Sequence, residues 1–139
     1  MTLVRDAMVP EPRTLAATAT AQEAGVHLER PEVRAVLVCD DGLLVGMITR
    51  KTLVREIVAA GRDPRTTQLG QIAEPPHHTL DPELPIDEAF RFLEEHDVER
   101  VPVTENGRLV GILSRSALQR RLAEDEPPAD EPEASQQQV

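Results

Sequence analysis

The chain has 139 residues and a formal net charge of −10, and Phe90 and Phe92 are its only Phe, Tyr or Trp residues. This length fits one compact unit or two small ones, whose core must be aliphatic. The chain has few aromatic rings and more acidic than basic residues. This composition argues against binding to nucleic acids or to anionic membrane surfaces. No apolar run approaches the ~20 residues of a membrane span.

The first half of the chain opens with a predicted turn over residues 4–8 and a short extended piece at Thr14-Leu15. Apolar and small residues then recur at helical spacing from Ala21 to Leu28. Thr20 and Glu23 stand three residues apart at the start of this run. That spacing predicts a capping box at the N-terminus of a helix.

A β-hairpin is predicted next. Residues 35–39 are rich in strand-forming side chains and run into Asp41-Gly42, a dipeptide typical of two-residue hairpin turns. The returning strand, 43–49, is a nearly continuous apolar run, so we expect both of its faces to be buried. A second helix follows, and Gly61 suits its C-terminal cap.

The second half repeats this pattern 65 residues later. With that shift and no gaps, 16 of the 51 positions from Val4 to Val54 are identical. The densest match aligns Gly42-Leu-Leu-Val-Gly46 with Gly107-Arg-Leu-Val-Gly111. We therefore expect an α/β (α+β) fold in which β-α-β-β-α occurs twice about a pseudo-twofold axis.

The repeat divides the chain into a first domain at 1–61, a linker at 62–68 and a second domain at 69–123. Residues 124–139 are rich in Pro, Gln and acids with few apolar side chains, a composition typical of disorder. Two equivalent clefts should lie between the copies, and the function is expected there. Gly25 aligns with Phe90, so the first copy should leave room on a buried face that the second copy fills.

The two stretches Gly42–Thr49 and Gly107–Ser114, each of the form Gly-x-hydrophobic-hydrophobic-Gly-hydrophobic-hydrophobic-Thr/Ser, resemble the CBS domain family, as does Glu99-Arg-Val-Pro-Val103. The resemblance covers residues 4–122 and implies tandem CBS domains, a Bateman module. It also implies a non-enzymatic regulatory role, with adenine-containing ligands such as AMP, ATP or S-adenosylmethionine bound between the copies.

The residues themselves indicate a phosphate site. Thr49 and Ser114 end predicted strands where helices begin, beside backbone N–H groups that attract anions. Arg50 and Arg115 follow them, and a guanidinium can bind a phosphate through two hydrogen bonds. The alternatives are that both hydroxyls only cap helices and that both arginines are solvated.

The family resemblance also implies an adenine slot, lined by the first hairpin strand and by the short strand before the first helix. Apolar walls there would suit a flat heteroaromatic base. Val36 and Val101 are equally explained as core residues. The matching positions in this chain are Thr14, Val36, Leu37, Thr79, Arg100, Val101 and Pro102.

The chain departs from the nucleotide-binding version of the motif, which ends Thr/Ser-x-x-Asp and uses that aspartate for the ribose hydroxyls. Thr52 and Ala117 stand at the two aspartate positions, where the Thr52 hydroxyl is a candidate ligand contact and Ala117 offers none. The loss of such charge-assisted hydrogen bonds costs about 1.5–3 kcal/mol, roughly tenfold to a hundredfold in affinity. Three interpretations remain open: the chain binds nucleotides weakly, it binds a ligand that needs no contact to a ribose, or it has lost its ligand.

No catalytic motif or acid/base pair stands out, and we predict neither an enzyme nor a required cofactor. The adjacent His77 and His78 need further partners such as His96 to bind a metal, so no metal site is predicted. The lone Cys39 and the absence of a signal peptide favour a reducing cytoplasm.

Two functions remain. The first is a sensor of an adenine-containing or other anionic metabolite that signals to an unidentified protein partner. The second is a protein-interaction or dimerisation module with degenerate ligand sites. In both cases exposed helix faces favour a homodimer.

Overall fold

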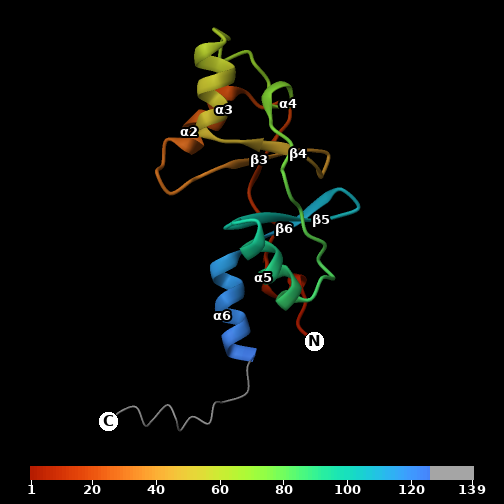
Figure 1. Ribbon diagram of the computed structural model, residues 1–139. Coiled ribbons are helices and arrows are strands. Elements are labelled where there is room, and N and C mark those ends of the chain that lie inside the picture. Colours follow the sequence, from red (N-terminus) through yellow and green to blue (C-terminus); the bar gives the residue numbers. More distant parts are fainter. Residues whose placement is uncertain (126–139) are drawn as a thin grey trace, which may run out of the picture.

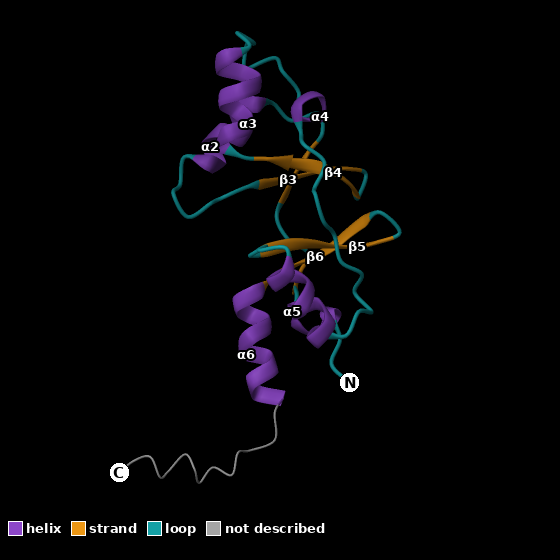
Figure 2. Cartoon of the chain, in the orientation of Figure 1, coloured by secondary structure: helices purple, strands orange, loops and turns teal. Residues whose placement is uncertain are grey.

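The computed structural model describes residues 1–125. Two helical layers lie at opposite ends of an elongated molecule, and the strands face each other between them (Figure 1). One layer holds the longer helices of the first copy and the other holds those of the second, while the short opening helix of each copy lies in the layer of the other copy (Figure 2). The predicted α/β fold with two copies of one unit is therefore confirmed.

The first copy contributes α1 (Val4–Ala7), β1 (Val9–Pro10), β2 (Thr14–Ala16), α2 (Ala21–Leu28), β3 (Val36–Asp40), β4 (Leu43–Ile48), α3 (Arg50–Leu53) and its continuation η1 (Val54–Ala59). The second contributes α4 (Leu69–Ile72), α5 (Ile86–Glu95), β5 (Arg100–Glu105), β6 (Arg108–Ser114) and α6 (Arg115–Asp125). The last turn of α6 includes two residues of the predicted acidic tail. The remainder, 126–139, lies outside the described residues.

Local sequence signals account for the caps and turns. The Thr20 hydroxyl accepts from the Glu23 backbone N–H at 3.2 Å, and the Glu23 carboxylate accepts from the Thr20 N–H at 3.0 Å. Asp41 and Gly42 have φ angles of 54° and 85°, and Asn106 and Gly107 have 55° and 81°. These positive angles are those that a type I′ hairpin turn requires.

Two elements differ from the sequence expectation. Around Thr79-Leu80 no strand forms, and a single parallel bridge joins Leu80 to Val103. The second helix of the first copy widens after Leu53 into a π-helical turn, η1. Nothing in its sequence marks that change.

The two hairpins join into one six-stranded sheet. Strand β2 pairs in parallel with β3. The pairs β3–β4, β5–β6 and β1–β6 are antiparallel. The hairpins meet at their tips, where β4 and β6 pair through Leu43 and Arg108. Both hairpins carry a register shift at the same repeat position, after Val38 and after Val103.

Each copy lends its opening segment to the other. Val4 is fully buried in the core of the second copy, and its N–H donates to the Leu84 carbonyl at 2.8 Å. Leu69 and Ile72 are buried in the core of the first copy instead. Each core is therefore completed by residues from the other half of the sequence.

Gly46 and Gly111 end the two repeated Gly-x-Leu-Val-Gly blocks, and each lies where an opening segment crosses a strand. A Cβ atom on Gly46 would lie 2.5 Å from the Glu74 carbonyl oxygen. A Cβ atom on Gly111 would lie 2.5 Å from the Met8 sulfur and 2.9 Å from the Val9 carbonyl oxygen. Glycine permits both close approaches because it has no side chain.

Among residues 1–125, no helix is both long and apolar enough to cross a membrane.

Candidate ligand cleft between the copies

A cavity of about 250 Å³ lies between the two copies. The sequence-predicted residues Leu37, Arg100, Val101 and Pro102 meet in its wall. Leu37 and Val101 are 7% and 1% exposed, so they serve the cores as well as the cavity. The complete lining is Pro12, Arg13, Arg34, Ala35, Leu37 and Met47 from the first copy and Arg100, Val101, Pro102 and Ile112 from the second.

A smaller cavity of about 150 Å³ adjoins the cleft and shares Arg13 and Ala35 with it. Thr14 and Val36, both predicted as wall residues, lie here. His27 and Arg30 also contribute to its lining. Thr79, the repeat partner of Thr14, is exposed and lies outside both cavities.

The hydroxyl residues at the strand ends cap helices. The Thr49 hydroxyl accepts from the Thr52 backbone N–H at 3.2 Å, and the Thr52 hydroxyl accepts from the Thr49 N–H at 3.1 Å. Thr52 is fully buried, so its hydroxyl does not face a cleft. The Ser114 hydroxyl accepts from the Ala117 N–H at 3.2 Å. The structure thus has the capping arrangement that the sequence left as the alternative for Thr49 and Ser114.

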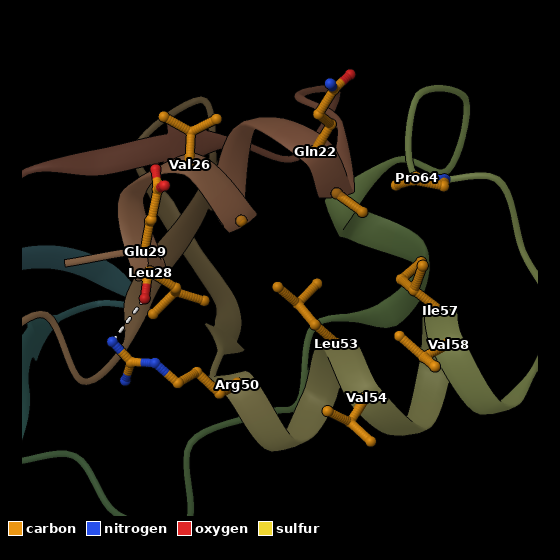
Figure 3. Close-up of a pocket in the computed structure, with 12 residues that line it drawn as sticks. Gln22, Val26, Leu28, Glu29, Arg50, Leu53, Val54, Ile57, Val58 and Pro64 are labelled. Carbon is orange, nitrogen blue, oxygen red and sulfur yellow. Dashed lines mark hydrogen bonds between the residues drawn. The ribbon is translucent and has the colours of Figure 1, made fainter. Parts of the chain in front are cut away.

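Both repeat-matched arginines contact protein groups. Arg50 Nη2 donates to the Leu28 carbonyl oxygen at 2.6 Å, at the end of α2 (Figure 3). It also donates to the Arg30 carbonyl oxygen at 2.7 Å. Arg115 Nε lies 3.6 Å from a Glu99 carboxylate oxygen. Arg115 Nη1 lies 3.7 Å from Asp97. Neither arginine lines the two cavities described above.

Sequence reasoning missed three cleft residues, Arg13, Arg30 and Arg34. A signal for them exists in the repeat, since the positions 65 residues later hold His78, Glu95 and Glu99. A search for identical pairs passes over such mismatches. The basic character of the cleft is therefore carried by positions at which the copies differ.

The histidine cluster belongs to the second copy. The rings of His78 and His96 have centroids 4.8 Å apart, and both rings pack on Phe92. His96 Nδ1 lies 2.9 Å from the Phe92 carbonyl oxygen. Within residues 1–125, no group of three or more His, Cys, Asp or Glu side chains is arranged to hold a metal ion. Elsewhere, burial raises the pKa of the Cys39 thiol, which disfavours a reactive thiolate.

A third cavity lies on the outer side of the first copy. It is an apolar groove of about 660 Å³ between α2 and the α3–η1 helix (Figure 3). Gly25 leaves this groove open, since a Cβ there would meet only Leu53 Cδ1, at 3.9 Å. Val26, Val54 and Val58 line it and are 63%, 58% and 73% exposed. In the second copy Phe90 stands at the Gly25 position and packs against the core.

A β-α-β-β-α unit that occurs twice, with a cavity lined by residues of both copies, defines a tandem-repeat module. The family model for the CBS domain matches residues 4–59 and 69–124. The chain therefore belongs to the CBS domain family.

Its relatives include proteins that consist of little more than such a pair. Hypoxic response protein 1 of Mycobacterium tuberculosis (strain ATCC 25618 / H37Rv) is 34% identical over 125 residues, covering 89% of this chain and 87% of the relative. The crystal structure of Hypoxic Response Protein I with two coordinated zinc ions has a TM-score of 0.73 at 33% identity, covering 87% of this chain and 99% of that one. CBSX2 in complex with AMP has a TM-score of 0.70 at 22% identity, covering 89% and 98%.

Proposed function

We propose that the chain is a regulatory module that binds an adenine-containing or other anionic metabolite in the cleft between its copies. The observation that carries this proposal is the cavity lined from both copies, with apolar walls at Leu37, Val101 and Pro102 and arginines at its edge. Apolar walls with a few polar groups are typical of small-molecule sites. CBSX2, a protein of the same fold, binds AMP, which makes nucleotides the first class to test.

The mechanism is a shift between arrangements of the two copies. A ligand that contacts Arg13 in one copy and Arg100 in the other favours the arrangement in which both contacts form. A partner protein that distinguishes these arrangements then receives the signal. The module works in the cytoplasm and catalyses no reaction.

Differential scanning calorimetry tests the proposal with AMP, ADP, ATP, S-adenosylmethionine, NAD and cyclic di-AMP. A ligand present at 100 times its dissociation constant adds about 2.7 kcal/mol to the free energy of unfolding. That gain raises the unfolding temperature by several degrees for a domain of this size. If no compound raises it at millimolar concentration, the sensor proposal fails.

The apolar groove favours a second candidate, a homodimerisation module. Exposed apolar patches of this kind mark interaction sites in soluble proteins. Val58→Asp tests it, because Val58 is 73% exposed and the substitution should leave the protomer folded. Sedimentation velocity should show a wild-type dimer and a monomeric variant. A wild-type monomer at all concentrations would exclude this candidate.

A further inference from the structure

The arginines without a partner gather at one place in the molecule. Of the 14 arginine side chains, nine make an ion pair or a hydrogen bond through their guanidinium group. Within the described part of the chain, the guanidinium groups of the other five make neither. Four of these five line the cleft or the cavity that adjoins it, and one lies elsewhere. The four are Arg13, Arg30, Arg34 and Arg100, here named the arginine cluster, and the fifth is Arg120.

The cluster is an electrostatic exception in an acidic protein. The chain carries 25 acids against 15 bases, yet no Asp or Glu is among the residues that line the central cavity. Glu32 and Glu99 lie in a neighbouring cavity that Arg34 and Arg100 also line, and Glu99 is already close to Arg115. Like charges in one cleft repel each other, and a bound anion relieves that repulsion.

The site is one-sided. The residues that align with Arg13, Arg30 and Arg34 in the second copy are His78, Glu95 and Glu99, and Ala35 aligns with Arg100. The pseudo-twofold operation therefore exchanges three arginines for one histidine and two carboxylates. The cluster of arginines therefore has no counterpart at the equivalent positions of the second copy.

We infer that the cleft is a single polyanion site, which takes one ligand with two or more adjacent phosphate groups per chain. This inference rests on the proposed function and specifies its ligand class. The guanidinium groups bind phosphate oxygens through paired hydrogen bonds. The ribose contributes little, because Thr52 is buried and Ala117 has no polar side-chain atom at the two ribose-binding positions.

Isothermal titration calorimetry without Mg²⁺ tests this with adenosine, AMP, ADP, ATP and inorganic tripolyphosphate. Affinity should rise from AMP to ATP, and tripolyphosphate should bind alone, with one site per chain, and compete with ATP. Arg34→Gln and Arg13→Gln should each weaken ATP by about tenfold to a hundredfold. Arg120→Gln is the matched control, since Arg120 is also without a partner among the described residues but lies outside the cleft. It should leave the affinity unchanged.

Several results would overturn the inference. Two tripolyphosphate ions per chain would contradict the one-sided site, and an equal loss in Arg120→Gln would reveal only non-specific attraction. AMP that binds as tightly as ATP, and equally well to the arginine variants, would refute the polyanion site while the proposed function stands. Binding of none of the five compounds would refute the polyanion site, and the proposed function would fail as well only if S-adenosylmethionine, NAD and cyclic di-AMP also left the unfolding temperature unchanged. Circular dichroism confirms that each variant is folded, as expected for substitutions of exposed side chains.

Discussion

Replacement of Gly46 by alanine should strongly destabilise the protein. The new Cβ would stand 2.5 Å from the Glu74 carbonyl oxygen, 2.8 Å from its carbon and 3.2 Å from the Ala73 Cβ. The first two are backbone atoms of the crossing segment, so no side-chain rotation relieves the contact. The segment must move away from Met47, with which Glu74 exchanges two backbone hydrogen bonds of 2.8 and 3.0 Å.

The magnitude follows from these contacts. Overpacking of a tight site costs about 1–3 kcal/mol, and each weakened hydrogen bond costs about 0.5–1.5 kcal/mol. Moving the crossing segment relieves the overpacking only by weakening its hydrogen bonds to Met47. We therefore expect Gly46→Ala to lower the free energy of unfolding by about 2–4 kcal/mol.

Gly25→Ala is the matched control. Gly25 lies inside α2, and its Cβ would meet only Leu53 Cδ1, at an ordinary 3.9 Å. Alanine in a helix interior is favoured over glycine by about 0.5–1 kcal/mol. The same chemical change should therefore stabilise the protein at one position and destabilise it at the other.

Urea unfolding followed by circular dichroism at 222 nm measures both variants, with the denaturant slope checked for constancy. A Gly46→Ala variant within 0.5 kcal/mol of wild type would refute the close-approach argument. So would a Gly25→Ala variant that loses more stability than Gly46→Ala.

Three further outcomes are expected. Arg50→Gln should lower the free energy of unfolding, measured in urea, by about 1 kcal/mol, because the Arg50 guanidinium caps the carbonyl end of α2. An unchanged free energy would show that this cap does not stabilise the fold. Thr52→Val should cost about 1–2 kcal/mol by the same assay because it removes a buried hydroxyl from the capping box, and a neutral result would contradict that role. The raised pKa of Cys39 means that folded protein holds less thiolate than unfolded protein, so iodoacetamide should label it more slowly at pH 8 without urea than with urea. Through the same group, stability should fall as the pH rises above the thiol pKa of the unfolded chain, and equal labelling rates would refute both statements.

Features set by neighbouring residues could be predicted from the sequence. The turns at Asp41-Gly42 and Asn106-Gly107 depend on backbone preferences of those dipeptides, and the Thr20–Glu23 box depends on one helical turn. Both were predicted and confirmed. The family also followed from the sequence, because two copies of one motif at constant spacing are specific where a single copy is not.

Features set by distant contacts could not be predicted. Gly46 and Gly111 are identical in the alignment of the copies, but the reason lies in segments that cross them from the other half of the chain. Arg50 stands where a phosphate ligand would be expected, yet its long side chain reaches the end of α2, about 20 residues earlier. Of the arginine cluster, Arg100 was predicted, whereas Arg13, Arg30 and Arg34 were missed because they lie in loops that only the fold brings together.

The exchange of opening segments has a consequence for synthesis on the ribosome. Val9 and Pro10 pair with Ile112 and Gly111, about 100 residues further along, so this strand has no partner until most of the chain has emerged. At ~5–20 residues per second that delay is roughly 5–20 s. Apolar Val4 remains unburied until the core of the second copy forms. Neither half, released alone, would possess a complete core.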